Sequence, residues 1–245
     1  MRDIQKALEE HKQAVTELYP EDQILGIFLY GSQNYNLATE NSDVDTKVII
    51  IPTTWQLIFD PVKTQTLDLP NGEKCVIMSI AHWVKNLQKQ SLNYLETLFT
   101  KYRWINPKHK AIWDKTFEEW KDEIADCNLE RGIRSAAHQA INTLREKQSG
   151  KKLGMGYMLR KFIYERIALE PFSKSIWIES PLRNCIIELK EGKTFCTSRD
   201  FEYLIQSIQK LMEGDLGINR DENKINALNT KMEQAVIQFI NSRQL

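Results

Sequence analysis

Short apolar runs separated by polar turns characterise the N-terminal part of the chain. Residues 24–30 form one such run, which ends at Gly31, and residues 43–51 contain a second run that is rich in β-branched side chains. Short apolar segments of strand-forming residues, bounded by turn residues, predict buried β-strands. The same pattern predicts two further strands, over residues 63–69 and 74–79. Together these segments indicate a small mixed sheet.

Apolar residues recur at helical spacing on both sides of these strands. Near the N-terminus, Ile4, Leu8, Val15 and Leu18 fall close to one face of a helix that we expect over residues 2–18. The same spacing predicts further helices over residues 79–90, from about residue 92, and over 107–126, 129–148, 153–169, 181–191, 198–213 and 221–242.

The change from strands to helices divides the chain at a turn signal, Asn106-Pro107. We therefore predict an α/β fold in which residues 1–104 form a small mixed-sheet domain and residues 105–245 form an all-helical domain. Clefts between domains are common ligand sites, so the active cleft is expected between these two parts.

Composition narrows the functional classes. The chain of 245 residues contains 33 Lys plus Arg and 33 Asp plus Glu, so no global field attracts nucleic acid and any such binding requires a local patch. The four widely spaced cysteines predict reduced thiols rather than a zinc site. No apolar run reaches membrane-spanning length, which favours a soluble, cytoplasmic protein without membrane partners. Nothing in the pattern indicates an oligomeric state.

A glycine turn follows the first predicted strand. Gly31 permits a positive φ, and Ser32 is a favourable helix N-cap, so a short helix is expected to begin near Gln33. The start of such a helix would present free N–H groups and a positive dipole end to an anion. We expect Gly31 and Ser32 to bind phosphate, with the Ser32 hydroxyl as an additional donor.

Two aspartates stand one residue apart at the start of the second predicted strand. The strand period of two places Asp43, Asp45 and Lys47 on one face. Adjacent carboxylates repel each other unless a cation lies between them, and Mg²⁺ or Mn²⁺ suits their oxygen ligands and substrate phosphates. We therefore expect Asp43 and Asp45 to bind metal, with Lys47 tuning their charge or contacting phosphate.

The combined motif resembles a known fold. The string Tyr-Gly-Ser-Gln-Asn-Tyr-Asn-Leu beginning at Tyr30, followed by Ser-Asp-Val-Asp-Thr-Lys ending at Lys47, resembles the nucleotidyltransferase fold of the DNA polymerase β superfamily. It is most similar to the bacterial and phage branch of predicted nucleotidyltransferases associated with RNA repair. A second string, Asn-Tyr-Leu-Glu-Thr-Leu-Phe-Thr-Lys ending at Lys101, resembles the helix that follows the family's core. The resemblance covers roughly residues 24–104 well and the remainder only loosely.

The resemblance implies an activity. Proteins of this superfamily use two divalent metals to transfer a nucleotide from a nucleoside triphosphate to a hydroxyl group, with release of pyrophosphate. Gly31 and Ser32 would then hold the triphosphate, and Asp43 and Asp45 would hold the metals and act in catalysis. The favoured acceptor is an RNA end, with a protein or a small molecule as alternatives.

A third carboxylate completes the family's site, and here the sequence departs from the pattern. Relatives carry an acid in the second strand of the hairpin, where this chain has the apolar segment that begins at Cys75. Glu73 and Asp68, which flank the Asn-Gly turn, are the local substitutes, and Glu73 is taken as the candidate catalytic residue. Glu96, on the following helix, is another possibility, although a packing or hydrogen-bonding role is favoured for it.

Basic residues beyond the core are the remaining candidates. In the family, a helix of the second domain presents basic side chains to the triphosphate, and Arg160 and Lys152 occupy suitable positions. Tyr157 stands where the family often has His. The segment from Lys101 to Trp113 interleaves aromatic and basic residues, which suits either single-stranded nucleic acid or an interdomain core.

Two further functional hypotheses stay open. Without its third acid, the protein could be a nucleotide-binding regulator that has lost turnover but retains Gly31, Ser32, Asp43 and Asp45. Alternatively, it could be a toxin-type enzyme that nucleotidylates a protein or a transfer RNA. The sequence contains neither a Walker phosphate loop nor a Gly-x-Ser-x-Gly element, which argues against P-loop and serine hydrolase classes.

Overall fold

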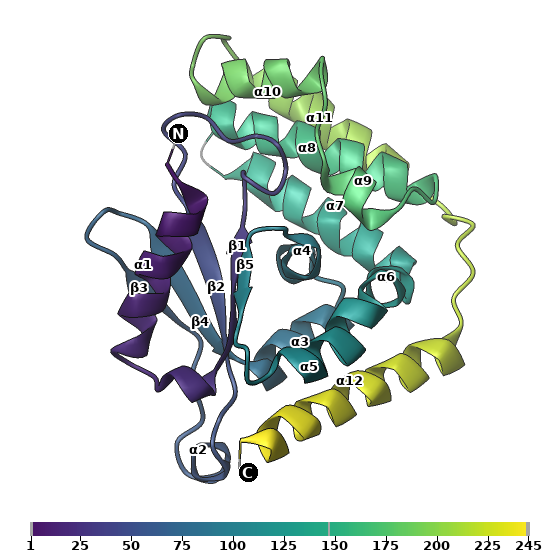
Figure 1. Ribbon diagram of the computed structural model, residues 1–245. Coiled ribbons are helices and arrows are strands. Elements are labelled where there is room, and N and C mark those ends of the chain that lie inside the picture. The colour runs from purple at the N-terminus through teal and green to yellow at the C-terminus, as the bar shows by residue number, and fades with distance from the viewer. Residues whose placement is uncertain (1, 147, 244–245) are drawn as a thin grey trace.

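A five-stranded mixed sheet forms the centre of the N-terminal part of the molecule (Figure 1). This computed structural model describes residues 2–146 and 148–243. The strands run in the spatial order β3-β4-β2-β1-β5. Only β2 and β4 pair in parallel, and the other neighbours are antiparallel. The strands are β1 (Ile24–Tyr30), β2 (Asp45–Ile50), β3 (Gln65–Asp68), β4 (Lys74–Ser79) and β5 (Arg103–Ile105).

The pairing of the two central strands positions the predicted motif. β1 and β2 are nearly fully buried, which explains the apolar sequence of β1 and of the last three residues of β2. Their antiparallel register places Tyr30 opposite Asp45. The connection between the strands, residues 31–44, therefore leaves and returns at the same end of the sheet. This register brings the glycine turn and the aspartates to one place.

Helix α1 (Ile4–Thr16) covers one face of the sheet (Figure 1). Asp3 caps it by accepting hydrogen bonds from two backbone N–H groups of the first turn. Its buried Leu8 and Val15 pack in one cluster with apolar side chains of β1, β2 and β4. This face also carries a buried polar group around His11, described below.

The opposite face of the sheet packs against an aromatic cluster. Phe28 of β1 contacts Trp83 of helix α3 (Ile80–Gln88) and Trp113, which in turn contact Phe117. Trp113 has an exposed fraction of only 1%, so this residue of the aromatic and basic segment belongs to the core. Phe239, from the far C-terminal helix, stacks on Phe117 and closes the cluster.

A layer of helices completes the molecule. Helix α8 packs against α7, α10 and α11, whereas α12 returns to pack against α3 and α5 (Figure 1). These helices are α4 (Leu92–Phe99), α5 (Lys110–Trp113), the π-helical segment η2 (Asp114–Glu118), α6 (Glu119–Asp126), α7 (Leu129–Arg145), α8 (Gly150–Ile167), α9 (Phe172–Ile176), α10 (Leu182–Lys190), α11 (Ser198–Leu211) and α12 (Glu222–Ser242).

The predicted strands and long helices are confirmed, with small shifts at their ends. Three short elements were not predicted: η1 (Glu21–Gln23), α2 (Thr54–Ile58) and α9. Strand β5 was also not predicted, because it pairs with β1 through only a few half-buried residues. The α/β prediction is confirmed at the level of a mixed sheet combined with many helices.

Two global features complete the description. The four cysteines are free thiols. Within the described residues, none of the helices combines the length and apolar composition that crossing a bilayer requires.

Candidate functional site

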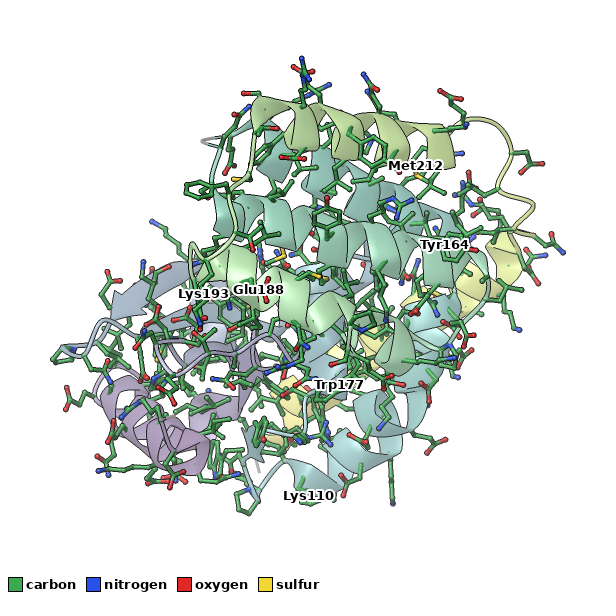
Figure 2. All side chains as sticks on the ribbon, turned by 90° about the horizontal axis from the view of Figure 1, so that it is seen from above. Lys110, Tyr164, Trp177, Glu188, Lys193 and Met212 are labelled. Atoms are coloured by element: carbon green, nitrogen blue, oxygen red, sulfur yellow. The ribbon has the colours of Figure 1, made fainter. Side chains whose placement is uncertain are left out.

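A cavity of about 360 Å³ lies between the connection 31–44 and the helices α8 and α10. Four of the predicted site residues line it: Gly31, Ser32, Asp43 and Asp45. Figure 2 shows the end of α10, labelled at Glu188, and the segment after it, labelled at Lys193, beside the N-terminal segments. The remaining lining residues are Tyr30, Tyr35, Leu37, Thr39, Asn41, Ser42, Lys151, Met155, Ile186, Lys190 and Glu191.

The segment after β1 is a series of turns, so the prediction of a short helix from Gln33 is wrong. Gly31 has a φ of 89°, as expected for a glycine turn. Its carbonyl accepts the N–H of Asn34, and the Ser32 carbonyl accepts the N–H of Leu37. This pattern does not continue into a helix, so the segment after β1 brings no helix dipole to the cavity. Within the described part of the chain, the Ser32 N–H makes no hydrogen bond.

A buried glutamate anchors this turn. Glu96 of α4 is 1% exposed, and its Oε2 accepts the Gly31 N–H at 2.9 Å and the Asn34 side-chain amide at 3.2 Å. The Gly31 N–H is therefore engaged by Glu96, contrary to the expectation that it faces phosphate. Burial raises the pKa of Glu96, while the charge of Lys47 and the Gly31 hydrogen bond partly oppose that rise. The sequence favours a packing or hydrogen-bonding role for Glu96 over that of a third acid, and the structure identifies the Gly31 turn as its partner.

Lys47 is buried and does not line the cavity. Its side chain is on the same sheet face as Asp45, but its exposed fraction is 5%. The Nζ atom lies 3.3 Å from the centroid of the Tyr30 ring and 5.6 Å from that of Tyr94. Burial lowers the pKa of Lys47 to about 8, against the attraction of Glu96 and Asp45. This placement fits the tuning of charge rather than direct contact with phosphate.

Asp43 and Asp45 share the cavity, although β2 begins only at Asp45. The Oδ1 atom of Asp45 accepts the Lys74 N–H at 3.0 Å. Burial raises the pKa of Asp45, and the charge of Asp43 adds to this effect despite the Lys74 hydrogen bond. A cation between the two carboxylates would remove that mutual repulsion.

The donor set fits Mg²⁺ or Mn²⁺. Such ions are commonly held by one or two carboxylates and complete their coordination with water and substrate phosphates. Among the described residues, no group of three or more His, Cys, Asp or Glu side chains forms a metal site. The two aspartates would therefore bind the metal together with a ligand that brings its own oxygens.

Glu73 does not join the aspartate pair. It is 3% exposed and contacts Arg2, His11 and Asn71. His11 in turn hydrogen-bonds Thr46, with 2.8 Å between Nδ1 and Oγ1. Because side chains alternate along a strand, Thr46 points to the α1 face while Asp45 points to the opposite face.

The sheet thus separates the Glu73 carboxylate from the cavity. Glu73 lies two residues before Cys75, which packs on the α1 side, so strand alternation also directs it to that face. The other turn acid, Asp68, has a largely exposed side chain that pairs with Lys74. Neither residue of the hairpin turn lines the cavity.

The two basic residues predicted on α8 also lie outside the cavity. Lys152 pairs with Glu146, and Arg160 donates from Nε to the Ser207 hydroxyl at 2.6 Å, toward α11. Their place is taken by Lys151 and Lys190, which line the cavity. One step along a helix rotates a side chain by about 100°, so a single-residue error in helical phase exchanges Lys152 for Lys151.

Lys190 was missed because no motif marks it. Its Nζ donates to the carbonyl of Leu37 in the connection 31–44. Burial lowers the pKa of Lys190, and the neighbouring charge of Lys151 lowers it further. Two ammonium groups that repel each other in this way favour an anion in the cavity, as the acidic pair favours a cation.

Comparison of the chain with protein-family models found no match, and neither did comparison with curated proteins. The functional conclusion therefore depends on the geometry of the cavity and on the motifs that line it.

Proposed function

We propose that this protein is a metal-dependent nucleotidyltransferase that resembles the DNA polymerase β superfamily and its branch associated with RNA repair. It transfers a nucleotide from a nucleoside triphosphate to a hydroxyl acceptor, with an RNA end as the favoured acceptor. The observation that carries this proposal is the shared cavity of the Gly31-Ser32 turn and the Asp43 and Asp45 carboxylates.

The arrangement of the fold supports the same proposal. Residues 1–104 act as the nucleotidyltransferase domain and residues 105–245 as the helical domain. Basic residues reach the cavity from helices of the second part, at Lys151 and Lys190, while Asp43 and Asp45 come from the first part. The second part also contributes one acid, Glu191, which pairs with Lys193. A triphosphate carrying divalent metal contains both charges that such a divided cavity attracts.

Each lining residue has a distinct role in this mechanism. The Ser32 N–H and hydroxyl donate to a phosphate oxygen, and Lys151 and Lys190 offset the charge of the leaving phosphates. Asp43 and Asp45 would hold Mg²⁺ or Mn²⁺. When bound, such ions neutralise charge on the reacting phosphoryl oxygens and orient them.

The reaction itself is a displacement at the α-phosphate. The acceptor oxygen forms a bond to the α-phosphorus, the bond from that phosphorus to the oxygen bridging to the β-phosphate breaks, and pyrophosphate leaves. The proton of the acceptor hydroxyl passes to solvent.

A second candidate is a nucleotide-binding regulator with little or no turnover. It is favoured by one observation: each acid considered for the third position is engaged elsewhere. Glu73 contacts Arg2 and His11, and Asp68 pairs with Lys74. Glu96 anchors the Gly31 turn. The toxin-type alternative shares the proposed chemistry and differs only in the acceptor.

The test combines binding and transfer. The full chain is incubated with Mg²⁺ and labelled triphosphates, together with RNA, cellular protein or transfer RNA as acceptors. We expect label transfer to RNA ends, and we expect Asp43→Ala and Asp45→Ala each to reduce it at least a hundredfold, because each removes a metal ligand. Asp60→Ala, which removes an exposed acid outside the cavity, is the matched control.

Each outcome selects one hypothesis. Triphosphate binding that depends on Asp43 and Asp45 but yields no transfer to any acceptor supports the regulator. Labelled protein or transfer RNA in place of labelled RNA ends supports the toxin-type enzyme. Triphosphate binding that is unaffected by both substitutions contradicts all three hypotheses.

A further inference from the structure

The middle of the connection 31–44 is joined to the segment that follows helix α9. Ile178 lies in this segment, directly after Trp177, which is labelled in Figure 2. Its N–H donates to the carbonyl of Tyr35 at 3.2 Å, and its carbonyl accepts the Asn36 side-chain amide at 2.9 Å. Ile178 is fully buried, so water does not compete for either bond. Both polar groups of its backbone are thus satisfied by the connection.

Two cations of helix α10 hold the next two carbonyl groups of the connection. Arg183 donates from Nε to the carbonyl of Asn36 at 2.8 Å, and Lys190 donates from Nζ to the carbonyl of Leu37. Hydrogen bonds with a charged donor are roughly twice as strong as those between neutral groups. Three consecutive residues of the connection therefore contact the helical layer through their backbone.

The backbone of Asn36 also indicates that these contacts hold it in place. Its φ is 61°, in the left-handed region that residues other than glycine seldom adopt. Asparagine reaches this region more readily than most residues, yet the conformation still costs free energy. Such conformations persist where surrounding contacts over-determine them, and Asn36 contributes both its side-chain amide and its carbonyl to the contact.

This contact sets the width of the first cavity. The connection carries Ser32 and Asp43 to one wall, and α10 carries Lys190 to the other. The hydrogen bonds at residues 35–37 therefore fix how far the proposed phosphate-binding turn lies from the lysine. An ammonium group has three donors, so Lys190 can keep its carbonyl acceptor and still donate to a phosphate oxygen.

We propose that Asn36 and Arg183 are positioning residues that hold the connection 31–44 ready for a triphosphate. Neither side chain lines the cavity, so neither contacts the ligand directly. The inference rests on the proposed function, since it concerns the ligand of the same cavity. The apparent dissociation constant is the intrinsic one divided by the fraction of molecules in the binding-competent conformation. Release of the connection should therefore weaken binding without changing the bound complex.

The test measures binding of ATP with Mg²⁺ to the full chain by calorimetry. We expect Asn36→Gly to weaken the affinity about fivefold, the effect of one net hydrogen bond. Glycine adopts the left-handed conformation freely, so this variant removes the side-chain donor without adding backbone strain. Arg183→Ala should weaken the affinity by a similar factor, and Arg183→Lys, which keeps the charge and a donor, should recover part of the loss. Arg199→Ala, which truncates an exposed arginine on α11, is the matched control and should bind as the wild type does.

Two further measurements separate positioning from a merely structural effect. In a transfer assay, Asn36→Gly and Arg183→Ala should each raise the KM for ATP by the same factor and keep kcat within about twofold, because the bound complex is unchanged. Amide hydrogen exchange of the connection 31–44 should be faster in Asn36→Gly than in the wild type without ligand, and equal at saturating ATP and Mg²⁺. Exchange in α12, which packs against α3 and α5, should not change.

Three results would overturn the inference: an affinity that neither Asn36→Gly nor Arg183→Ala changes, a fall in kcat with an unchanged KM, or exchange of the connection that is the same in the wild type and the variants. If Asn36→Gly does not fold, as judged by circular dichroism, Arg183→Ala and Arg183→Lys decide the question. Failure of the wild type to bind ATP would reject the proposed function together with this inference. Weaker ATP binding by the variants, without transfer by the wild type, would support both the inference and the regulator.

Discussion

At the scale of single residues, the candidate site depends on a buried charge that lies outside the cavity. Glu96 satisfies the Gly31 N–H and the Asn34 amide, and it faces the buried ammonium of Lys47. A turn held by one carboxylate keeps its shape without a helix. The position of Ser32 in the cavity is therefore a consequence of a side chain that comes from α4.

Removal of this anchor should be costly. Glu96→Ala leaves the Gly31 N–H without its acceptor and removes an opposite charge near the buried Lys47. Leaving a buried hydrogen-bonding group unsatisfied costs about 1–3 kcal/mol. Urea denaturation should show this loss in the free energy of unfolding. Glu9→Ala, which truncates an exposed glutamate on α1, should change it by less than about 0.5 kcal/mol. Similar values for the two variants would contradict the anchoring role.

Glu73 is also a buried acid, but its pKa is lowered, whereas that of Glu96 is raised. Burial raises the pKa of Glu73, but hydrogen bonds from Arg2, His11 and Asn71 outweigh this effect and hold the pKa below the ordinary 4.5. A carboxylate with a depressed folded-state pKa contributes stability above its unfolded pKa, and that contribution is lost as the pH falls through the folded pKa.

The expected result is a pH-dependent difference between the wild type and Glu73→Gln. At pH 7 the wild type should be more stable by about 1–3 kcal/mol, the value of hydrogen bonds to a charged group. The difference should shrink as the pH falls below about 4.5. Glu202→Gln, an exposed change on α11, should show no such pH dependence. If the difference in stability between the wild type and Glu73→Gln did not change with pH, the charge of Glu73 would not be its cause.

At the scale of elements, close packing of two helices positions the cavity lysines. Gly150 opens α8, and a Cβ atom there would lie 2.0 Å from the carbonyl oxygen of Leu189 on α10. Lys190 follows Leu189 directly, and Lys151 follows Gly150. The distance between these helices therefore sets the separation of the two ammonium groups.

Gly150→Ala tests this contact against helix propensity. Alanine favours a helix over glycine by about 1 kcal/mol, yet the clash with backbone should make this variant less stable by about 1–3 kcal/mol. Gly132→Ala on α7 is the matched control, because its Cβ would meet only Gln90 at 3.6 Å. The control should be neutral or slightly stabilising. Thermal denaturation of both variants measures the difference, and stabilisation by Gly150→Ala would contradict the close contact.

At the scale of the whole molecule, one hydrophobic core crosses the proposed domain boundary. The main cluster contains Phe28 and Ile49 of the sheet together with Phe162 of α8 and Phe239 of α12. Helix α12, the last element of the chain, returns to α3 near the sheet (Figure 1). The two proposed domains therefore contribute side chains to one common hydrophobic core and do not merely touch at a surface.

A shared core predicts a single unfolding event. Tryptophan fluorescence reports on the six tryptophans, which include Trp83 and Trp113 of the aromatic cluster. Far-ultraviolet circular dichroism reports on the helices. We expect both signals to change with the same midpoint on heating or in urea, as for a cooperative unit. Two separated transitions would show that the halves unfold independently.

Local sequence determined the order and type of most elements, because strand and helix periods depend on neighbouring residues. The apolar runs of β1 and β2 and the long helices could be predicted in this way. The proximity of Gly31-Ser32 to Asp43 and Asp45 was also predictable. When two neighbouring antiparallel strands are joined by one connection, that connection begins and ends at the same end of the sheet.

Only the tertiary structure decided which other charged residues join them. Glu73 is held on the α1 side by Arg2 and His11, and Glu96 reaches the Gly31 turn from a helix distant in sequence. Lys151 rather than Lys152 entered the cavity because helix packing sets the rotation of α8. These choices depend on contacts between residues far apart in the chain, which local periodicity does not encode.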